Sequence, residues 1–104
     1  MDDAVCLHNA NVYTGFSVMK NCAIYIKDGK IADVYNEKRF QQKKFSSKVR
    51  VIDLLGANVI PGFMDTHIHG SGGFSTDDGD YRSILGMSSF LARYGITSFI
   101  PTIG

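Results

Sequence analysis

The second half of the chain constrains the fold most strongly, because its sequence has the pattern of one unit of a parallel sheet. An apolar segment at residues 63–69 precedes a glycine-rich stretch at residues 70–79, and residues 80–94 then carry apolar side chains at helical spacing. A second apolar segment follows at residues 96–100. Parallel strands need a long crossover connection. We therefore predict strand, loop, helix and strand over residues 62–104.

Both ends of this helix carry recognisable signals. Asp78 or Asp80 can accept hydrogen bonds from the free amides of the first turn. Gly95 can end the helix in the left-handed conformation, which costs glycine little. We therefore expect the helix to begin near Asp80 and to end before Gly95.

The first half of the chain has the pattern of a β-rich domain. Short apolar segments that predict strands occur at residues 4–7, 11–13, 23–26, 31–35, 51–54 and 59–60. Asp28 and Gly29 separate two of these segments and predict a tight hairpin turn, because such turns need positive φ. The pattern changes near Pro61, so we predict one domain over residues 1–60 and a second over residues 61–104.

Residues 36–50 interrupt the strand pattern and are strongly basic. One acid, Glu37, accompanies six basic side chains: Lys38, Arg39, Lys43, Lys44, Lys48 and Arg50. A patch for phosphate or nucleic acid is one interpretation, and a solvated excursion tied down by Phe40 and Phe45 is the other. The net charge of +1 for the whole chain favours the solvated excursion.

Composition limits the classes of protein to which the chain can belong. Its 104 residues are 44% apolar and 20% charged, which is typical of a globular protein and argues against disorder. The charge balance predicts no nucleic-acid partner, and no apolar run approaches the roughly 20 residues of a membrane span.

The N-terminus and the cysteines predict a cytoplasmic chain. The N-terminus begins Met-Asp-Asp and lacks the basic start and apolar core of a signal peptide. In a reducing cytoplasm Cys6 and Cys22 act as small buried hydrophobes, and a disulfide between them is the alternative.

Two histidines supply the clearest chemical signal. His67 and His69 share one face of the predicted strand, because successive side chains alternate between faces. The strand ends there, and parallel α/β folds hold their active sites at that end. Neutral imidazoles are suited to a divalent ion, zinc first and iron second. We therefore predict that His67 and His69 bind a metal, and the alternative is that they are surface or hydrogen-bonded core histidines.

The chain supplies few further candidates for such a site. A catalytic centre of this kind needs about three protein ligands and an open position for water. His8 lies in an N-terminal strand or turn, where a structural role is expected. The acids Asp77, Asp78 and Asp80 are expected to cap the helix or shape its loop, and the alternative is that one of them reaches the metal.

Two features beside the histidines each have two interpretations. Asp65 has the parity of His67 and His69, so it can orient a ligand or accept hydrogen bonds from neighbouring backbone amides. The glycine-rich stretch at residues 70–73 can cradle a substrate oxygen or phosphate, or can be a flexible connection. No lysine follows it, so it is not a P-loop.

These residues together resemble a known family. The segment at residues 51–54, Gly56 and the run Pro-Gly-Phe-Met-Asp-Thr-His-Ile-His-Gly at residues 61–70 are similar to the start of amidohydrolase-superfamily enzymes. Within that superfamily, residues 69–74 and 95–102 most resemble the N-acetylglucosamine-6-phosphate deacetylases. Ser75 departs from the pattern, because an aspartate is expected there.

The resemblance implies a fold and an activity. It implies part of a small β-sandwich, followed by the first β-α-β unit of an incomplete (β/α)8 barrel, with a divalent metal on His67 and His69. It implies hydrolysis of N-acetylglucosamine 6-phosphate to glucosamine 6-phosphate and acetate. The remaining metal ligands, the catalytic aspartate and the sugar-phosphate contacts would come from elsewhere, so no catalytic residue is assigned to this chain.

We therefore expect the 104-residue chain alone to be inactive. We also expect it to self-associate or to pair with a missing C-terminal portion, because lone barrel strands expose apolar edges. Two alternatives stay open. One is another amidohydrolase, such as a dihydroorotase-like or hydantoinase-like enzyme or a deaminase, and the other is a non-catalytic metal-binding or assembly module.

Overall fold

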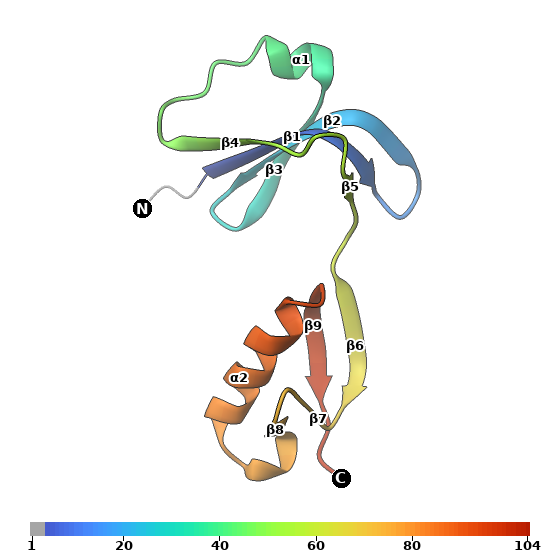
Figure 1. The fold of residues 1–104 in the computed structure, drawn as a ribbon, viewed down its shortest axis with the longest axis vertical. Coiled ribbons are helices and arrows are strands. Elements are labelled where there is room, and N and C mark those ends of the chain that lie inside the picture. Colours follow the sequence, from blue (N-terminus) through green and yellow to red (C-terminus); the bar gives the residue numbers. More distant parts are fainter. Residues whose placement is uncertain (1–3) are drawn as a thin grey trace. The chain divides into compact units, whose positions relative to one another are not determined.

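The computed structural model describes residues 4–104, and residues 1–3 lie outside the described part (Figure 1). The chain divides after Pro61 into two compact units. We call the part up to Pro61 unit 1 and the part from Gly62 to Gly104 unit 2. Among the described residues, no helix is both long and apolar enough to cross a membrane.

Unit 1 is built on a five-stranded sheet. Its strands are β1 (Ala4–Tyr13), β2 (Val18–Lys27), β3 (Lys30–Asn36), β4 (Val49–Asp53) and β5 (Asn58–Val59). The order is β3-β2-β1-β4, and β5 also pairs with β1. The β2 strand runs antiparallel to both β1 and β3, whereas β4 and β5 run parallel to β1.

The predicted break in the first strand is wrong, because β1 is one bulged strand. Asn9 has φ of 57°, and the register with β2 shifts between Leu7 and Ala10. The backbone at the bulge keeps its partners: the Leu54 N–H donates to the His8 carbonyl (2.9 Å), and the Gly56 N–H donates to the Asn9 carbonyl (2.8 Å). A bulge therefore absorbs the polar residues without ending the strand.

The predicted hairpin turn is confirmed. Asp28 and Gly29 have φ of 53° and 74°, and they connect the paired residues Lys27 and Lys30. Two consecutive positive φ values match the twist of the flanking strands.

The basic segment contains a short helix that the sequence pattern did not predict, α1 (Glu37–Gln41). The Asn36 side chain caps it by accepting a hydrogen bond from the Arg39 N–H at 2.8 Å. Phe40 stacks on His8 with ring centroids 4.4 Å apart, and Phe45 packs near Tyr25. The predicted aromatic anchors are therefore confirmed, and all six basic side chains of the segment are exposed.

Unit 1 has two buried clusters. Ala23 and Ile24 are consecutive in β2 and belong to different clusters, as strand alternation requires. Cys6 and Cys22 are also in different clusters, and both are free thiols, so the disulfide alternative is wrong. Beside the Ile24 cluster lies an open apolar groove of about 290 Å³, lined in part by Val12, Ile31, Val34, Val59 and Ile60.

Unit 2 contains the predicted parallel β-α-β arrangement. Strand β6 (Phe63–Ile68) pairs in parallel with β9 (Ile96–Pro101), and α2 (Tyr81–Ala92) forms the crossover, with Met87 and Leu91 buried (Figure 1). The continuation of a barrel beyond these two strands stays a prediction.

The stretch that was expected to be a loop has regular structure. It holds the hairpin β7 (Gly70–Ser71) and β8 (Phe74–Ser75), followed by the short 3-10 helix η1 (Thr76–Asp78). This hairpin connects the histidine motif to α2.

Candidate metal centre

His67 and His69 lie together at the C-terminal end of β6. His67 is within the strand, and His69 follows it directly. Their Nε2 atoms are 3.1 Å apart, their ring centroids are 4.8 Å apart, and the ring planes meet at 78°. Both side chains are exposed to solvent. The strand thus brings the two nitrogens toward one point, as the parity of the sequence predicts.

The geometry of this pair fits two ligands of one ion. Zinc–nitrogen bonds of about 2.0–2.1 Å at tetrahedral angles place two ligand nitrogens about 3.3–3.4 Å apart. The 3.1 Å separation of the Nε2 atoms is close to that value. The same separation also suits a hydrogen bond between a protonated and an unprotonated imidazole nitrogen. The distance supports a metal site, and a metal titration separates the two interpretations.

Asp65 contacts the backbone of the motif. Its Oδ1 accepts a hydrogen bond from the His67 N–H at 3.1 Å. The pairing of β6 with β9 is irregular between Asp65 and Ile68, where the His67 amide turns to this carboxylate. The interpretation of Asp65 as an acceptor for backbone donors is confirmed, and a role in orienting an imidazole stays a prediction.

His69 is held by the segments that follow the two parallel strands. Its carbonyl accepts a hydrogen bond from the Thr76 N–H at 2.9 Å. The backbone at Gly104 lies against its ring, because a Cβ built there would be 2.9 Å from His69 Cε1. These contacts restrict where the ring of His69 can lie.

The glycine-rich hairpin packs against α2. Gly72 and Gly73 form its turn with φ of 63° and 86°. A Cβ on Gly72 would lie 2.4 Å from the Phe90 ring, and one on Gly86 would lie 2.3 Å from the Phe74 ring. These glycines therefore allow close packing, and the structure has an ordered hairpin where a flexible connection was one expectation. The oxygen-cradling role of the loop stays a prediction.

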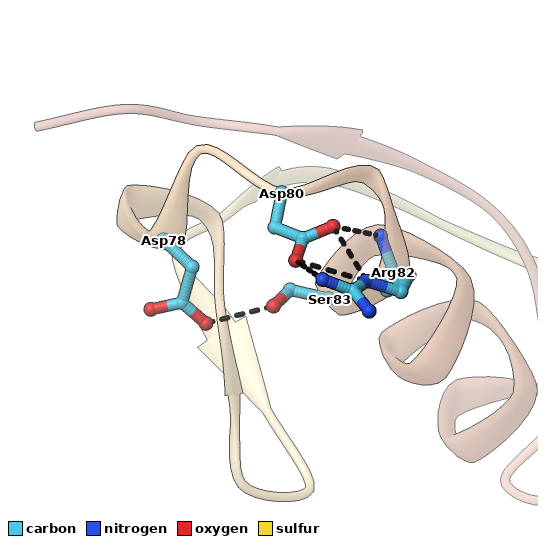
Figure 2. A network of polar contacts seen from close by, with 4 residues as sticks. All are labelled: Asp78, Asp80, Arg82 and Ser83. Atoms are coloured by element: carbon cyan, nitrogen blue, oxygen red, sulfur yellow. Dashed lines mark hydrogen bonds and ion pairs between the residues drawn. The ribbon is translucent and has the colours of Figure 1, made fainter.

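The acidic residues after the hairpin organise the start of α2, as Figure 2 shows. The Asp80 carboxylate accepts hydrogen bonds from the Arg82 backbone N–H (2.9 Å) and from the Arg82 guanidinium. These bonds, the guanidinium first, hold the pKa of Asp80 below its usual range. The Ser83 hydroxyl donates to Asp78 at 2.7 Å. The predicted cap at Asp80 is confirmed, and Gly95 ends the helix region with φ of 82°.

In the part of the chain that the structure describes, no third ligand joins the histidine pair. Within residues 4–104, no group of three or more His, Cys, Asp or Glu side chains has the geometry to hold a metal. His8 stacks on Phe40 in unit 1, so its predicted structural role is confirmed.

Thr76 belongs to the site, although no sequence pattern predicts it. Its side chain is 6% exposed, and its hydroxyl contacts the backbone at both strand ends. A threonine in a polar loop gives no sequence signal of burial. Ser75, where an aspartate was expected, caps η1 by accepting a hydrogen bond from the Asp77 N–H at 3.1 Å.

Comparisons with known proteins connect this geometry to a family. A family model described as the NagA composite domain matches residues 6–59, which lie in unit 1. The N-acetylglucosamine-6-phosphate deacetylase of Bacillus subtilis is 31% identical over 102 residues, covering 98% of this chain and 25% of the relative. The enzyme of the same name from Haemophilus influenzae is 30% identical over 97 residues, covering 92% of this chain and 24% of the relative.

A solved structure gives the same result for the fold. The N-acetylglucosamine-6-phosphate deacetylase of Pasteurella multocida matches with a TM-score of 0.82 and 26% identity, covering 96% of this chain and 25% of that one. The chain thus spans about a quarter of the length of the relatives that it matches. Because the family model matches more than half of the chain, the chain belongs to the NagA composite domain family.

Proposed function

We propose that this chain contributes two metal ligands, His67 and His69, to an amidohydrolase that removes the acetyl group from N-acetylglucosamine 6-phosphate. The convergence of the two Nε2 atoms at 3.1 Å, at the C-terminal end of a parallel strand, carries the metal part of the proposal. The names of the relatives carry the substrate part, because those proteins are N-acetylglucosamine-6-phosphate deacetylases.

The role of each histidine follows from its chemistry. Each would bind the ion through the Nε2 lone pair, so each ring must be neutral with its proton on Nδ1. Asp65 fixes the backbone of His67 by accepting its N–H. A divalent ion, zinc first and iron second, would supply Lewis-acid chemistry for amide hydrolysis.

Two histidines are an incomplete set of ligands. A hydrolytic site of this type uses about three protein ligands and one open position. In this proposal, residues outside this 104-residue sequence supply the further ligands, the catalytic aspartate and the contacts to the sugar phosphate. The chain alone would then bind metal weakly and would not turn over substrate.

A zinc titration tests the metal part directly. We expect isothermal titration of the 104-residue chain with Zn²⁺ to show weak binding, and His67→Ala or His69→Ala to abolish it. His8→Gln is the matched control, since it changes the remaining histidine and leaves the proposed ligands in place. An unchanged titration for His67→Ala would sink the two-ligand proposal.

An acetate assay tests the activity part. With N-acetylglucosamine 6-phosphate and Zn²⁺, the isolated chain should release no acetate. Acetate release that His67→Ala removes would show that the chain is catalytically complete, and would contradict the proposed division of the site.

A further inference from the structure

Thr76 occupies an unusual position next to the histidine motif. Among the residues that the structure describes, Thr76 is the one polar residue that is buried. Its hydroxyl lies 2.6 Å from the Thr102 carbonyl and 3.0 Å from the His69 carbonyl. Its backbone N–H also donates to the His69 carbonyl, at 2.9 Å. One residue therefore contacts the backbone that follows β6 and the backbone that follows β9.

These contacts extend the pairing of the two strands beyond its regular end. The Thr102 N–H donates to the Ile68 carbonyl at 2.8 Å, which joins the strand ends directly. Just beyond this bond, the Thr76 hydroxyl lies between the backbone carbonyls of His69 and Thr102 and connects the two segments. His69 lies outside β6, so these contacts and the Gly104 backbone fix its place.

The bridge depends on a hydroxyl group. The hydroxyl has one proton, and the shorter of its two contacts is to the Thr102 carbonyl, so the hydroxyl donates to Thr102. The Thr76 backbone N–H donates to the His69 carbonyl. A methyl group in place of the hydroxyl would leave the partly buried Thr102 carbonyl without this donor. Carbonyls shielded from water without a donor are unfavourable, so the strand ends would move to find another partner.

We propose that Thr76 is a positioning residue for the metal site, which it serves by holding His69 so that its Nε2 converges with that of His67. This inference rests on the proposed function, because it assumes that the histidine pair is the site. Thr76 contacts neither ring, and it acts through the backbone of His69.

Three variants of the full 104-residue chain separate positioning from simple stabilisation. Thr76→Val keeps the shape and removes the hydroxyl, and Thr76→Ser keeps the hydroxyl. Thr102→Val is the matched control, because the Thr102 hydroxyl bonds to the Ile100 carbonyl instead. In Zn²⁺ titrations well below the melting temperature, Thr76→Val should weaken affinity about tenfold, as removal of supporting partners does. Thr76→Ser and Thr102→Val should bind like the unaltered chain.

A metal-free measurement keeps the test independent of zinc binding. Long-range ¹H–¹⁵N spectra report the protonation and contacts of each imidazole nitrogen. Thr76→Val should shift the ring nitrogens of both His67 and His69, and Thr76→Ser should not. If the unaltered chain fails to bind Zn²⁺, the metal proposal fails, while these spectra still decide whether Thr76 positions the ring.

Two results would overturn the inference. One is a Thr76→Val chain that melts at lower temperature but keeps its zinc affinity and its histidine spectra, since Thr76 would then be structural only. The other is a large loss of affinity in Thr76→Ser, because the methyl group would then matter instead of the hydroxyl. The second result applies even where Thr76→Val does not fold.

Discussion

The two units of the chain bury their apolar side chains to very different extents. Unit 1 has a five-stranded sheet with two buried clusters, whose buried apolar members include Cys6, Ala10, Val12, Cys22, Ala23, Ile24 and Tyr35. Unit 2 buries Met87 and Leu91 between one helix and two strands, and Met64 in β6 is 67% exposed. Burial of apolar surface is the main stabilising contribution. Unit 1 therefore has the larger buried apolar core, whereas unit 2 buries few apolar side chains fully.

The difference also concerns function. The family model matches unit 1, while the histidine pair lies in unit 2. The recognisable domain and the proposed chemistry thus belong to different units. The unit with the smaller buried core carries the proposed site, so we expect unit 2 to be the less stable of the two.

Loss of the core of unit 2 should have the largest effect. Met87 is fully buried, and Met87→Ala should cost about 2–5 kcal/mol, as large-to-small core changes do. Unit 2 should then lose hydrogen-exchange protection while unit 1 keeps it. Leu85→Ala is the control on the same helix, since Leu85 is 58% exposed. Equal loss of protection in both units would contradict the comparison.

Self-association should come next in size. Met64 and Ile100 expose apolar surface on the strands of unit 2, so we expect the chain to form dimers or larger species at micromolar concentration. Light scattering after size exclusion measures this, and Met64→Lys should shift the chain toward the monomer. Phe16→Ser is the control, because Phe16 is fully exposed in a turn of unit 1. A stable monomer of the unaltered chain would count against the expectation.

An alkaline transition should distinguish unit 1. Burial raises the pKa of Tyr35, and also that of Cys6 and of Cys22. A group whose pKa is raised in the folded state contributes its full stabilisation at pH values below its unfolded-state pKa. That stabilisation is lost as the pH rises through the folded-state pKa. The melting temperature of unit 1 should therefore begin to fall above about pH 8.5, the ordinary cysteine value, and fall further above about pH 10, the ordinary tyrosine value.

The variant Tyr35→Phe isolates the phenol. It should reduce this alkaline loss, and the two thiols should account for the remainder. Tyr13→Phe is the control, since Tyr13 is 38% exposed. An alkaline loss as large in Tyr35→Phe as in the unaltered chain would remove Tyr35 from the explanation.

The smallest expected effect is at the cap of α2. The Arg82 contacts lower the pKa of Asp80 in the folded state. The Asp80 carboxylate therefore stabilises unit 2 at pH values above its unfolded-state pKa, and the stabilisation is lost as the pH falls through the lower folded-state pKa. Asp80→Asn keeps a capping oxygen and should flatten the acid side of the melting profile slightly. Asp80→Ala removes the cap and should lower the melting temperature of unit 2 at neutral pH as well. Identical profiles for both variants would show that the charge is irrelevant.

Much of the fold follows from local sequence signals. The turn at Asp28 and Gly29, the cap at Asp80 and the left-handed Gly95 are predictable, because backbone preferences and short side chains act over a few residues. The parallel unit follows from the order of apolar segments. The shared face of His67 and His69 follows from strand alternation alone.

Other features need contacts between distant residues. The bulge at Asn9 depends on backbone partners near residue 55, and the hairpin after His69 is held by Phe90 and Gly86 of α2. Phe40 could be named as an anchor, but its stacking on His8 could not.

The sequence by itself determined the parallel strand-helix-strand order of unit 2, the turn at Asp28 and Gly29, and that two imidazoles share a face, because these properties depend on neighbouring residues. The tertiary structure decided that the two nitrogens lie 3.1 Å apart and that the hydroxyl of Thr76 is buried between two strand ends. Those facts depend on how β9 and η1 meet the end of β6, over separations along the chain that no local pattern encodes.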